Sequence, residues 1–155
     1  MHREAMERAI SLAVENVQLG GGGPFGAVVV RHGKMIAEGA NQVTSHNDPT
    51  AHAEVVALRR ACQLVGHFEL KDCEIYASCE PCPMCLGAIY WARIGHLYFA
   101  ANRADAARVG FDDSFIYDEL SVPLVNRKIP TTEFLRDEAL AAFRLWNKST
   151  TKVPY

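Results

Sequence analysis

Two short segments that carry metal-binding side chains constrain the fold more than any other feature of the sequence. The first is His52-Ala53-Glu54 and the second is Pro81-Cys82-Pro83-Met84-Cys85. Each lies at the start of a predicted helix, over residues 51–64 and 83–91, and both helix starts follow strands of the predicted sheet. Two thiolates three residues apart at a helix N-terminus can face one point, where backbone N–H groups and the helix dipole favour the thiolate form. The imidazole of His52 can add a third ligand from a neighbouring helix.

The spacing of the apolar residues predicts an α/β protein. A helical repeat covers residues 1–20 and ends in a glycine run at 20–23, which predicts a turn. Strand-like runs follow at 25–31, 35–38, 74–78 and 95–100, and further helices at 104–109 and 135–146. The helix over 83–91 is almost wholly apolar and is expected to be buried. We therefore expect one domain over residues 1–155, a three-layer α/β/α sandwich with a mixed sheet of about five strands.

The composition indicates a single core and argues against a polyanion-binding surface. Of the 155 residues, 49% are hydrophobic, which suffices for one sizeable core without disulfides. Sixteen Lys and Arg stand against eighteen Asp and Glu, so no overall field attracts nucleic acid. The N-terminal segment lacks the features of a signal peptide, and no apolar run reaches membrane-spanning length. We expect neither a nucleic acid nor a membrane as a partner.

The cysteines indicate a metal site and not a disulfide framework. They are odd in number, and three of them fall within seven residues. A reducing cytoplasm fits this pattern best. The five are Cys62, Cys73, Cys79, Cys82 and Cys85.

The predicted ligands leave room for a reaction at the metal. Three ligands, from His52, Cys82 and Cys85, leave one tetrahedral position open for water, which is the arrangement of a catalytic zinc. A structural site would require a fourth Cys or His, and the sequence has no second Cys-x-x-Cys pair. Only Cys79 and His46 could supply an extra ligand, and Cys79 fits a buried thiol beside the site better.

Glu54 is the candidate proton carrier of this site. Zinc lowers the pKa of bound water to about 7, and Glu54 could take the water's proton and pass it to a ring nitrogen under attack. Taken alone, Glu54 could be merely a favourable charge in the first turn of a helix. The combination of H-x-E with P-C-x-x-C is, however, the signature of zinc-dependent nucleobase deaminases. A redox cysteine pair would leave His52 and Glu54 unexplained, and a non-catalytic zinc-stabilised module predicts that replacing Glu54 has no effect.

With their flanks, the two segments resemble the cytidine deaminase superfamily and, more narrowly, the bacterial guanine deaminases. The resemblance rests on residues 47–54 and 78–93, and it extends to Gly22-Gly23-Pro24-Phe25-Gly26-Ala27-Val28 and to residues 110–117. It covers nearly the whole chain, although about the last thirty residues match loosely. The resemblance implies hydrolysis of guanine to xanthine and ammonia, with one zinc ion per subunit and attack at C2, the carbon that bears the exocyclic amine.

The resemblance also implies roles for four further residues. Asp113 would help to carry a proton to the departing amine, while Glu54 protonates N3 of the purine. Asn41 would hydrogen-bond the purine, and Phe25 would line the pocket. Their ordinary alternatives are a turn residue at a strand end for Asn41, a helix cap for Asp113 and plain core for Phe25. The fourth is Tyr155, because these enzymes form homodimers in which the C-terminal segment crosses to the partner and its last residue helps to close the site; a frayed terminus is the alternative.

Two other functions share the zinc motif. A tRNA adenosine deaminase must bind a polyanion and flip out a base, so it should show a basic face. The other is a deaminase of a related base or nucleoside, such as guanosine, isocytosine, a cytosine-type base or a triazine, and the sequence does not decide against it. In the C-terminal part the basic residues Arg127, Lys128, Arg136, Arg144, Lys148 and Lys152 are interleaved with Glu119, Glu133, Asp137 and Glu138, which indicates a mixed solvated surface.

Overall fold

A tight hairpin opens the sheet. Strands β1 (Gly26–Arg31) and β2 (Lys34–Ala40) pair in antiparallel fashion, and His32 and Gly33 form the two-residue turn between them. Both turn residues have positive φ angles, 49° and 72°, as a turn that matches the twist of its strands requires. The hairpin predicted over 25–38 is therefore confirmed. The computed structural model describes residues 1–155, which separate into two compact units, residues 1–113 and 114–155.

The sheet of the first unit has four strands in the order β2-β1-β3-β4. Strand β3 (Cys73–Cys79) runs antiparallel to β1, whereas β4 (His96–Ala101) runs parallel to β3. The mixed sheet is as predicted, but it has one strand fewer than the expected five. The residues after β4 are helical, and Pro123 and Pro130 interrupt the apolar residues that follow, which leaves no run suited to a fifth strand.

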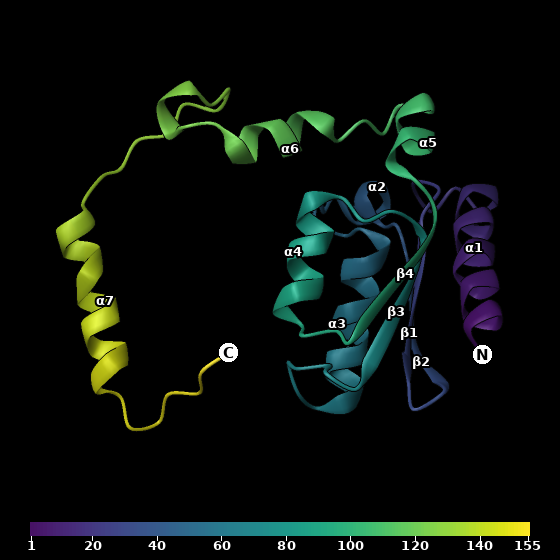
Figure 1. Cartoon of the computed structure of the whole chain (residues 1–155), viewed down its shortest axis with the longest axis horizontal. Coiled ribbons are helices and arrows are strands. Elements are labelled where there is room, and N and C mark those ends of the chain that lie inside the picture. The colour runs from purple at the N-terminus through teal and green to yellow at the C-terminus, as the bar shows by residue number, and fades with distance from the viewer. The chain divides into compact units, whose positions relative to one another are not determined.

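Helices cover both faces of this sheet. Helix α1 (His2–Gln18) packs on one face against β1 and β3, and α3 (Ala53–Val65) packs on the other against β2 and β1 (Figure 1). Helix α4 (Pro83–Trp91) lies beside α3, and the short helices α2 (Val43–His46) and α5 (Arg103–Arg108) complete the unit. The three-layer α/β/α arrangement is confirmed.

The core follows from the alternation of side chains along β1. Ala27 and Val29 join the cluster under α3 and α4, whereas Val28 and Val30 join the cluster under α1. All four are at most 2% exposed, so the strand is buried on both faces and its apolar run is continuous.

Helix α4 differs from the prediction that it is buried. Only Cys85 and Ile89 are buried, while Tyr90 and Trp91 are 71% and 62% exposed. The inner face of α4 contacts α3, but no element of this unit covers its outer face. An apolar helix whose outer face is exposed is a feature of surfaces that bind another protein.

The second unit is helical. It consists of α6 (Ser114–Ser121), a 3-10 turn η1 (Leu124–Asn126) and α7 (Arg136–Lys148). Helix α7 confirms the helix predicted over 135–146, whereas α2 and α6 were not predicted from the sequence. Large apolar side chains of α7 are exposed, among them Phe143 and Leu145. No helix of the protein is both long enough and apolar enough to span a membrane.

Candidate active site

The candidate metal ligands occupy equivalent positions on two helices. His52 is the N-cap residue of α3, and Cys82 is the N-cap residue of α4, each with extended backbone angles. The prediction had α3 begin at residue 51; it begins at Ala53 because Asp48 and Thr50 form a turn, in which Thr50 donates from its N–H and its hydroxyl to the Asp48 carboxylate. After this turn the chain enters α3 at its N-cap residue His52, just as it enters α4 at Cys82 after β3.

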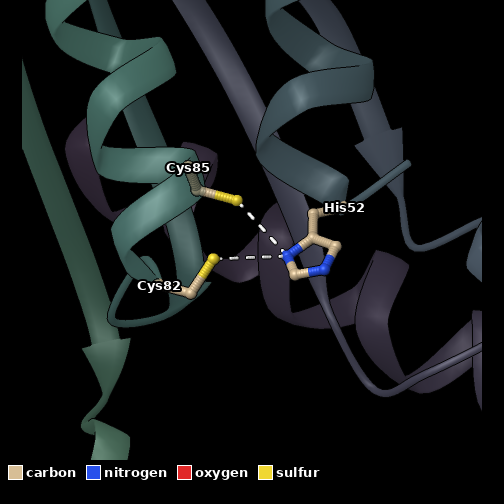
Figure 2. A group of neighbouring side chains, drawn as sticks. All are labelled: His52, Cys82 and Cys85. Carbon is tan, nitrogen blue, oxygen red and sulfur yellow. Dashed lines mark hydrogen bonds between the residues drawn. The ribbon is translucent and has the colours of Figure 1, made fainter. Parts of the chain in front are cut away.

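The three ligand atoms converge as a metal ion requires. The Sγ atoms of Cys82 and Cys85 lie 3.5 Å and 3.4 Å from Nδ1 of His52, and all three atoms lie within 4.8 Å of one another (Figure 2). Tetrahedral zinc with bonds of about 2.0–2.1 Å to nitrogen and about 2.3 Å to sulfur sets the N–S separation at about 3.6 Å. The donor set therefore fits zinc in both chemistry and spacing.

The ionisation of each cysteine depends on the other. The hydrogen bond with Cys85 lowers the pKa of Cys82 to about 4, with a further contribution from His52. The same bond, together with burial, raises the pKa of the Cys85 thiol. The hydrogen bond with the Cys82 thiolate raises the pKa of His52 in turn. A divalent cation bound by these groups displaces their protons, because only thiolate and neutral imidazole coordinate a metal.

Glu54 lies in the first turn of α3 and faces this cluster. Its side chain is buried, with 8% of the residue exposed, and burial raises the pKa of its carboxyl group. Cys85 is close enough to Glu54 for each to shift the pKa of the other. A helix-start carboxylate with only a stabilising role would be solvated, so burial beside the ligands supports the proton-carrier role.

Asp113 and Phe25 lie in the same unit as the metal ligands. Burial raises the pKa of Asp113, and the charge of Cys82 raises it further, so Asp113 is near the ligand cluster. The ring of Phe25 meets the edge of Phe111, with ring centroids 4.9 Å apart. Phe25 also packs against the core and lines a cavity of about 580 Å³ between α1 and α5, whose wall contains none of the metal ligands. The roles of Asp113 and Phe25 toward substrate stay predictions.

Asn41 is held in one orientation at the end of β2. Its side chain is buried, and its Oδ1 accepts hydrogen bonds from the N–H groups of Gly23 and Val43, each at 3.2 Å. Two backbone donors at one atom identify that atom as the oxygen. Because two backbone donors already occupy Oδ1, the group that Asn41 can offer to a substrate is its Nδ2 donor and not an acceptor.

The remaining candidates do not join the ligand cluster. Cys79 is buried and its thiol faces the Asn102 carbonyl oxygen, while His46 is exposed and contacts Ser45. Neither belongs to the group of side chains placed for a metal, which agrees with the prediction of three ligands. Tyr155 is exposed and lies in the second unit, so its role in closing a site stays a prediction.

Two residues near this site were not singled out from the sequence. Phe111 contacts Phe25, and the only signal for it was its place in the stretch 110–117 that resembles guanine deaminases. Asn16 contacts the loop that holds Asn41. The sequence feature that could have indicated this contact is an amide side chain in the last turn of a helix, just before a glycine run.

Comparison with known proteins gives the same assignment as the geometry. The family described as "Cytidine and deoxycytidylate deaminase zinc-binding region" matches residues 1–101. Guanine deaminase of Bacillus subtilis is 53% identical over 154 residues, which cover 99% of each chain. The crystal structure of guanine deaminase from Bacillus subtilis superposes with a TM-score of 0.97, covering 100% of this chain and 99% of the other. A tRNA-specific adenosine deaminase of Agrobacterium fabrum is 45% identical over 79 residues, or 51% of this chain and 52% of the relative.

These matches include the ligand cluster, and the zinc-binding region spans all four strands and both ligand-bearing helices. The likeness to the Bacillus subtilis protein continues through the second unit to the end of the chain. The chain therefore belongs to the zinc-binding cytidine and deoxycytidylate deaminase family, and within it to the group that includes the Bacillus subtilis guanine deaminase.

Proposed function

We propose that the protein hydrolyses guanine to xanthine and ammonia. The observation that carries the proposal is the extent of the likeness: guanine deaminase matches 99% of the chain, including residues 114–155, at 53% identity. The tRNA-specific adenosine deaminases of Agrobacterium fabrum and Aquifex aeolicus match 51% and 75% of the chain, at 45% and 34% identity. The mixed charge of the second unit also argues against a tRNA, because a polyanion requires a basic face. A small purine base is the proposed substrate.

Each side chain has a defined task in this reaction. His52, Cys82 and Cys85 would hold a zinc ion, which would act as a Lewis acid and lower the pKa of a water molecule to about 7. Glu54 takes a proton from the water and delivers it to N3 of guanine as the water oxygen bonds to C2. Asp113 helps to carry the proton that remains on the new C2 hydroxyl to the exocyclic amine, and the bond from C2 to that nitrogen breaks as ammonia leaves and the C2 carbonyl forms.

Binding of the base depends on Asn41 and Phe25. Because the Oδ1 atom of Asn41 is already occupied by two backbone donors, its Nδ2 group donates to an acceptor on the purine. Phe25 lines the pocket beside the ring, supported by its edge contact with Phe111.

The test is release of ammonia from a panel of substrates. The purified protein is incubated with guanine, guanosine, cytosine, cytidine, adenine or a tRNA, with zinc-free protein as the control. Ammonia from guanine alone, abolished without zinc and restored on its return, is the expected result. Release from another base with guanine inert would replace the substrate and discard the roles of Asn41 and Asp113.

A variant of Glu54 tests the mechanism apart from the substrate. Glu54→Gln keeps the size of the side chain but removes the proton carrier, so the rate should fall by about 10²–10⁴-fold. Zinc content is measured in the same sample to separate proton transfer from metal loss. Turnover retained at full zinc content would refute the role of Glu54 and favour a module in which zinc is only structural.

We further propose that the protein is a homodimer in which residues 114–155 cross to the partner and Tyr155 helps to close the partner's site. Exposed apolar side chains support this proposal: Tyr90 and Trp91 on the outer face of α4, and Phe143 and Leu145 on α7. This arrangement corresponds to the predicted single domain over 1–155 with an exchanged C-terminal segment, which stays a prediction. A frayed terminus is the alternative role for Tyr155.

Co-expression of two inactive variants tests the exchange. One chain carries Glu54→Gln, and the other lacks Tyr155. If the segment crosses, a mixed dimer contains one complete site, because the first chain supplies Tyr155 to the intact Glu54 of the second. Activity in the mixed dimer but in neither parent is expected; no recovery, or a monomer by sedimentation, would refute the exchange.

The compartment proposed for this reaction is the cytoplasm. All five cysteines are free thiols, and the two in the ligand cluster must be reduced to bind zinc.

A further inference from the structure

Asn16 joins the glycine run to the main chain of Asn41. The Nδ2 group of Asn16, in the last turn of α1, donates to the carbonyl oxygens of Gly23 and Asn41, each at 2.9 Å. An amide nitrogen carries two hydrogens, so both bonds can form at once. One side chain from the α1 layer therefore holds two backbone segments that are 18 residues apart in sequence.

The glycine run is shaped around this contact. A Cβ atom at Gly21 would lie 2.4 Å from the Asn16 Oδ1 atom, and one at Gly22 would lie 2.4 Å from the Asn41 carbonyl oxygen. Real Cβ contacts are essentially never shorter than 3.0 Å. The run is thus more than a plain turn: the absence of side chains lets the loop pass between two asparagines.

The loop held by Asn16 in turn fixes the side chain of Asn41. The carbonyl oxygen of Gly23 accepts from Asn16, while the N–H of the same residue donates to the Oδ1 atom of Asn41. If Asn16 released the loop, Gly23 could move and Asn41 would lose one of the two donors that set its orientation. A carboxamide free to rotate offers either an acceptor or a donor, and its binding specificity falls.

We infer that Asn16 is a positioning residue for substrate binding, which acts through Gly23 so that Asn41 offers only its Nδ2 group. The inference rests on the proposed deaminase function and extends it to a residue outside the reacting groups. Asn16 contacts none of the metal ligands, so it should affect binding of the base and not the chemical step.

Asn16→Asp tests this role with little change in shape. The carboxylate cannot donate, and it would face two carbonyl oxygens. We expect the KM of the substrate to rise about 10- to 100-fold with kcat changed much less, since Asn41 is misplaced in the ground and transition states alike. Zinc should remain at one ion per chain. Ser11→Ala is the matched control, because Ser11 lies on the same helix and donates only to Glu15, at 2.7 Å; its KM should not change.

A double-mutant cycle shows whether the effect passes through Asn41. If it does, Asn16→Ala raises KM in the wild-type background but adds little to Asn41→Ala, because the group being positioned is already absent. Effects that multiply would overturn the inference. So would an unchanged KM in Asn16→Asp, or loss of folding or zinc in both Asn16 variants, which would make Asn16 a structural residue.

The assay uses whichever base the wild-type protein deaminates. A wild-type protein active on a base other than guanine would overturn the proposed substrate while the KM comparison still decides the role of Asn16. A wild-type protein that deaminates no base would overturn both.

Discussion

Replacing Gly39 with alanine should damage the metal site from the sheet beneath it. Gly39 lies in β2, where α3 approaches most closely: an added Cβ atom would lie 2.2 Å from the carbonyl oxygen of Ala53 and 2.7 Å from the amide nitrogen of Ala57. Both are backbone atoms, so no side-chain rotation can relieve the contact. Helix α3 must move away from the sheet by close to 1 Å to restore contacts of about 3 Å. His52 and Glu54, at the start of that helix, must move with it.

Gly39→Ala should lower both the stability and the activity of the protein. Overpacking of this kind destabilises a protein by about 1–3 kcal/mol. At about 2–4 °C per kcal/mol for a chain of this size, Tm should fall by about 2–12 °C. A displacement of about 1 Å at the reacting groups should lower kcat/KM by about 10²-fold, and zinc affinity should fall by about 10-fold or more.

Gly26→Ala is the matched control for this experiment. An added Cβ at Gly26 would lie 2.2 Å from the carbonyl oxygen of Ala9 and 2.8 Å from the amide nitrogen of Ala13, but both belong to α1 on the opposite face of the sheet. The two variants should therefore lose similar stability. Only Gly39→Ala should lose zinc affinity and activity per folded molecule, measured by thermal unfolding, competition with a chelator and initial rates. Equal loss of zinc affinity and activity in both variants, or an unaltered Gly39→Ala, would refute the idea that this contact sets the position of the ligands.

Three further outcomes are expected. Cys85→Ser should release zinc, whereas Cys73→Ser, at an equally buried core thiol, should keep it by elemental analysis; zinc lost from both would show that the loss reflects unfolding. Asn41→Asp keeps the acceptor for the loop but lacks the donor, so KM should rise about 10-fold or more with little change in Tm, and an unchanged KM would exclude Asn41 from substrate binding. Hydrogen bonds from Arg8 lower the pKa of Glu38 from its usual 4.5, so the pair stabilises the fold above that pH and the contribution is lost as pH falls through the lowered pKa. Because both side chains are partly exposed, Glu38→Gln should lower the free energy of unfolding by less than about 1 kcal/mol at pH 7, and by progressively less as pH falls below 4.5, as urea unfolding can show.

The sequence was most informative where chemistry and local structure agree. Cys82 and Cys85 were predicted at a helix start because Pro83 favours the first helical position, and the helix begins there. The buried strands were visible as apolar runs. His52 was expected just inside α3, but the Asp48 turn delays the helix and makes His52 its N-cap.

Other features depend on contacts between distant segments and left no local signal. Asn41 looks like an ordinary strand-end residue until Gly23, from another loop, is placed against its side chain. The exposure of Tyr90 and Trp91 was missed because apolar composition indicates burial without saying in which assembly the burial occurs. The expected sheet of about five strands has one strand fewer, and the sequence contains only four strand-like runs.

The N-cap positions of His52 and Cys82 link metal binding to folding. A helix start is ordinarily stabilised by a side chain that accepts a hydrogen bond from the first turn, at about 1 kcal/mol. Neither residue makes such a bond, so both helices forgo that contribution, and their side chains meet each other instead. Helix α3 and strand β3 separate His52 from the two cysteines in the sequence. The unfolded chain therefore has no preformed site for the ion. Zinc binding therefore stabilises the two helix starts that lack a capping hydrogen bond. Part of the free energy that orders the site comes from binding of the ion itself.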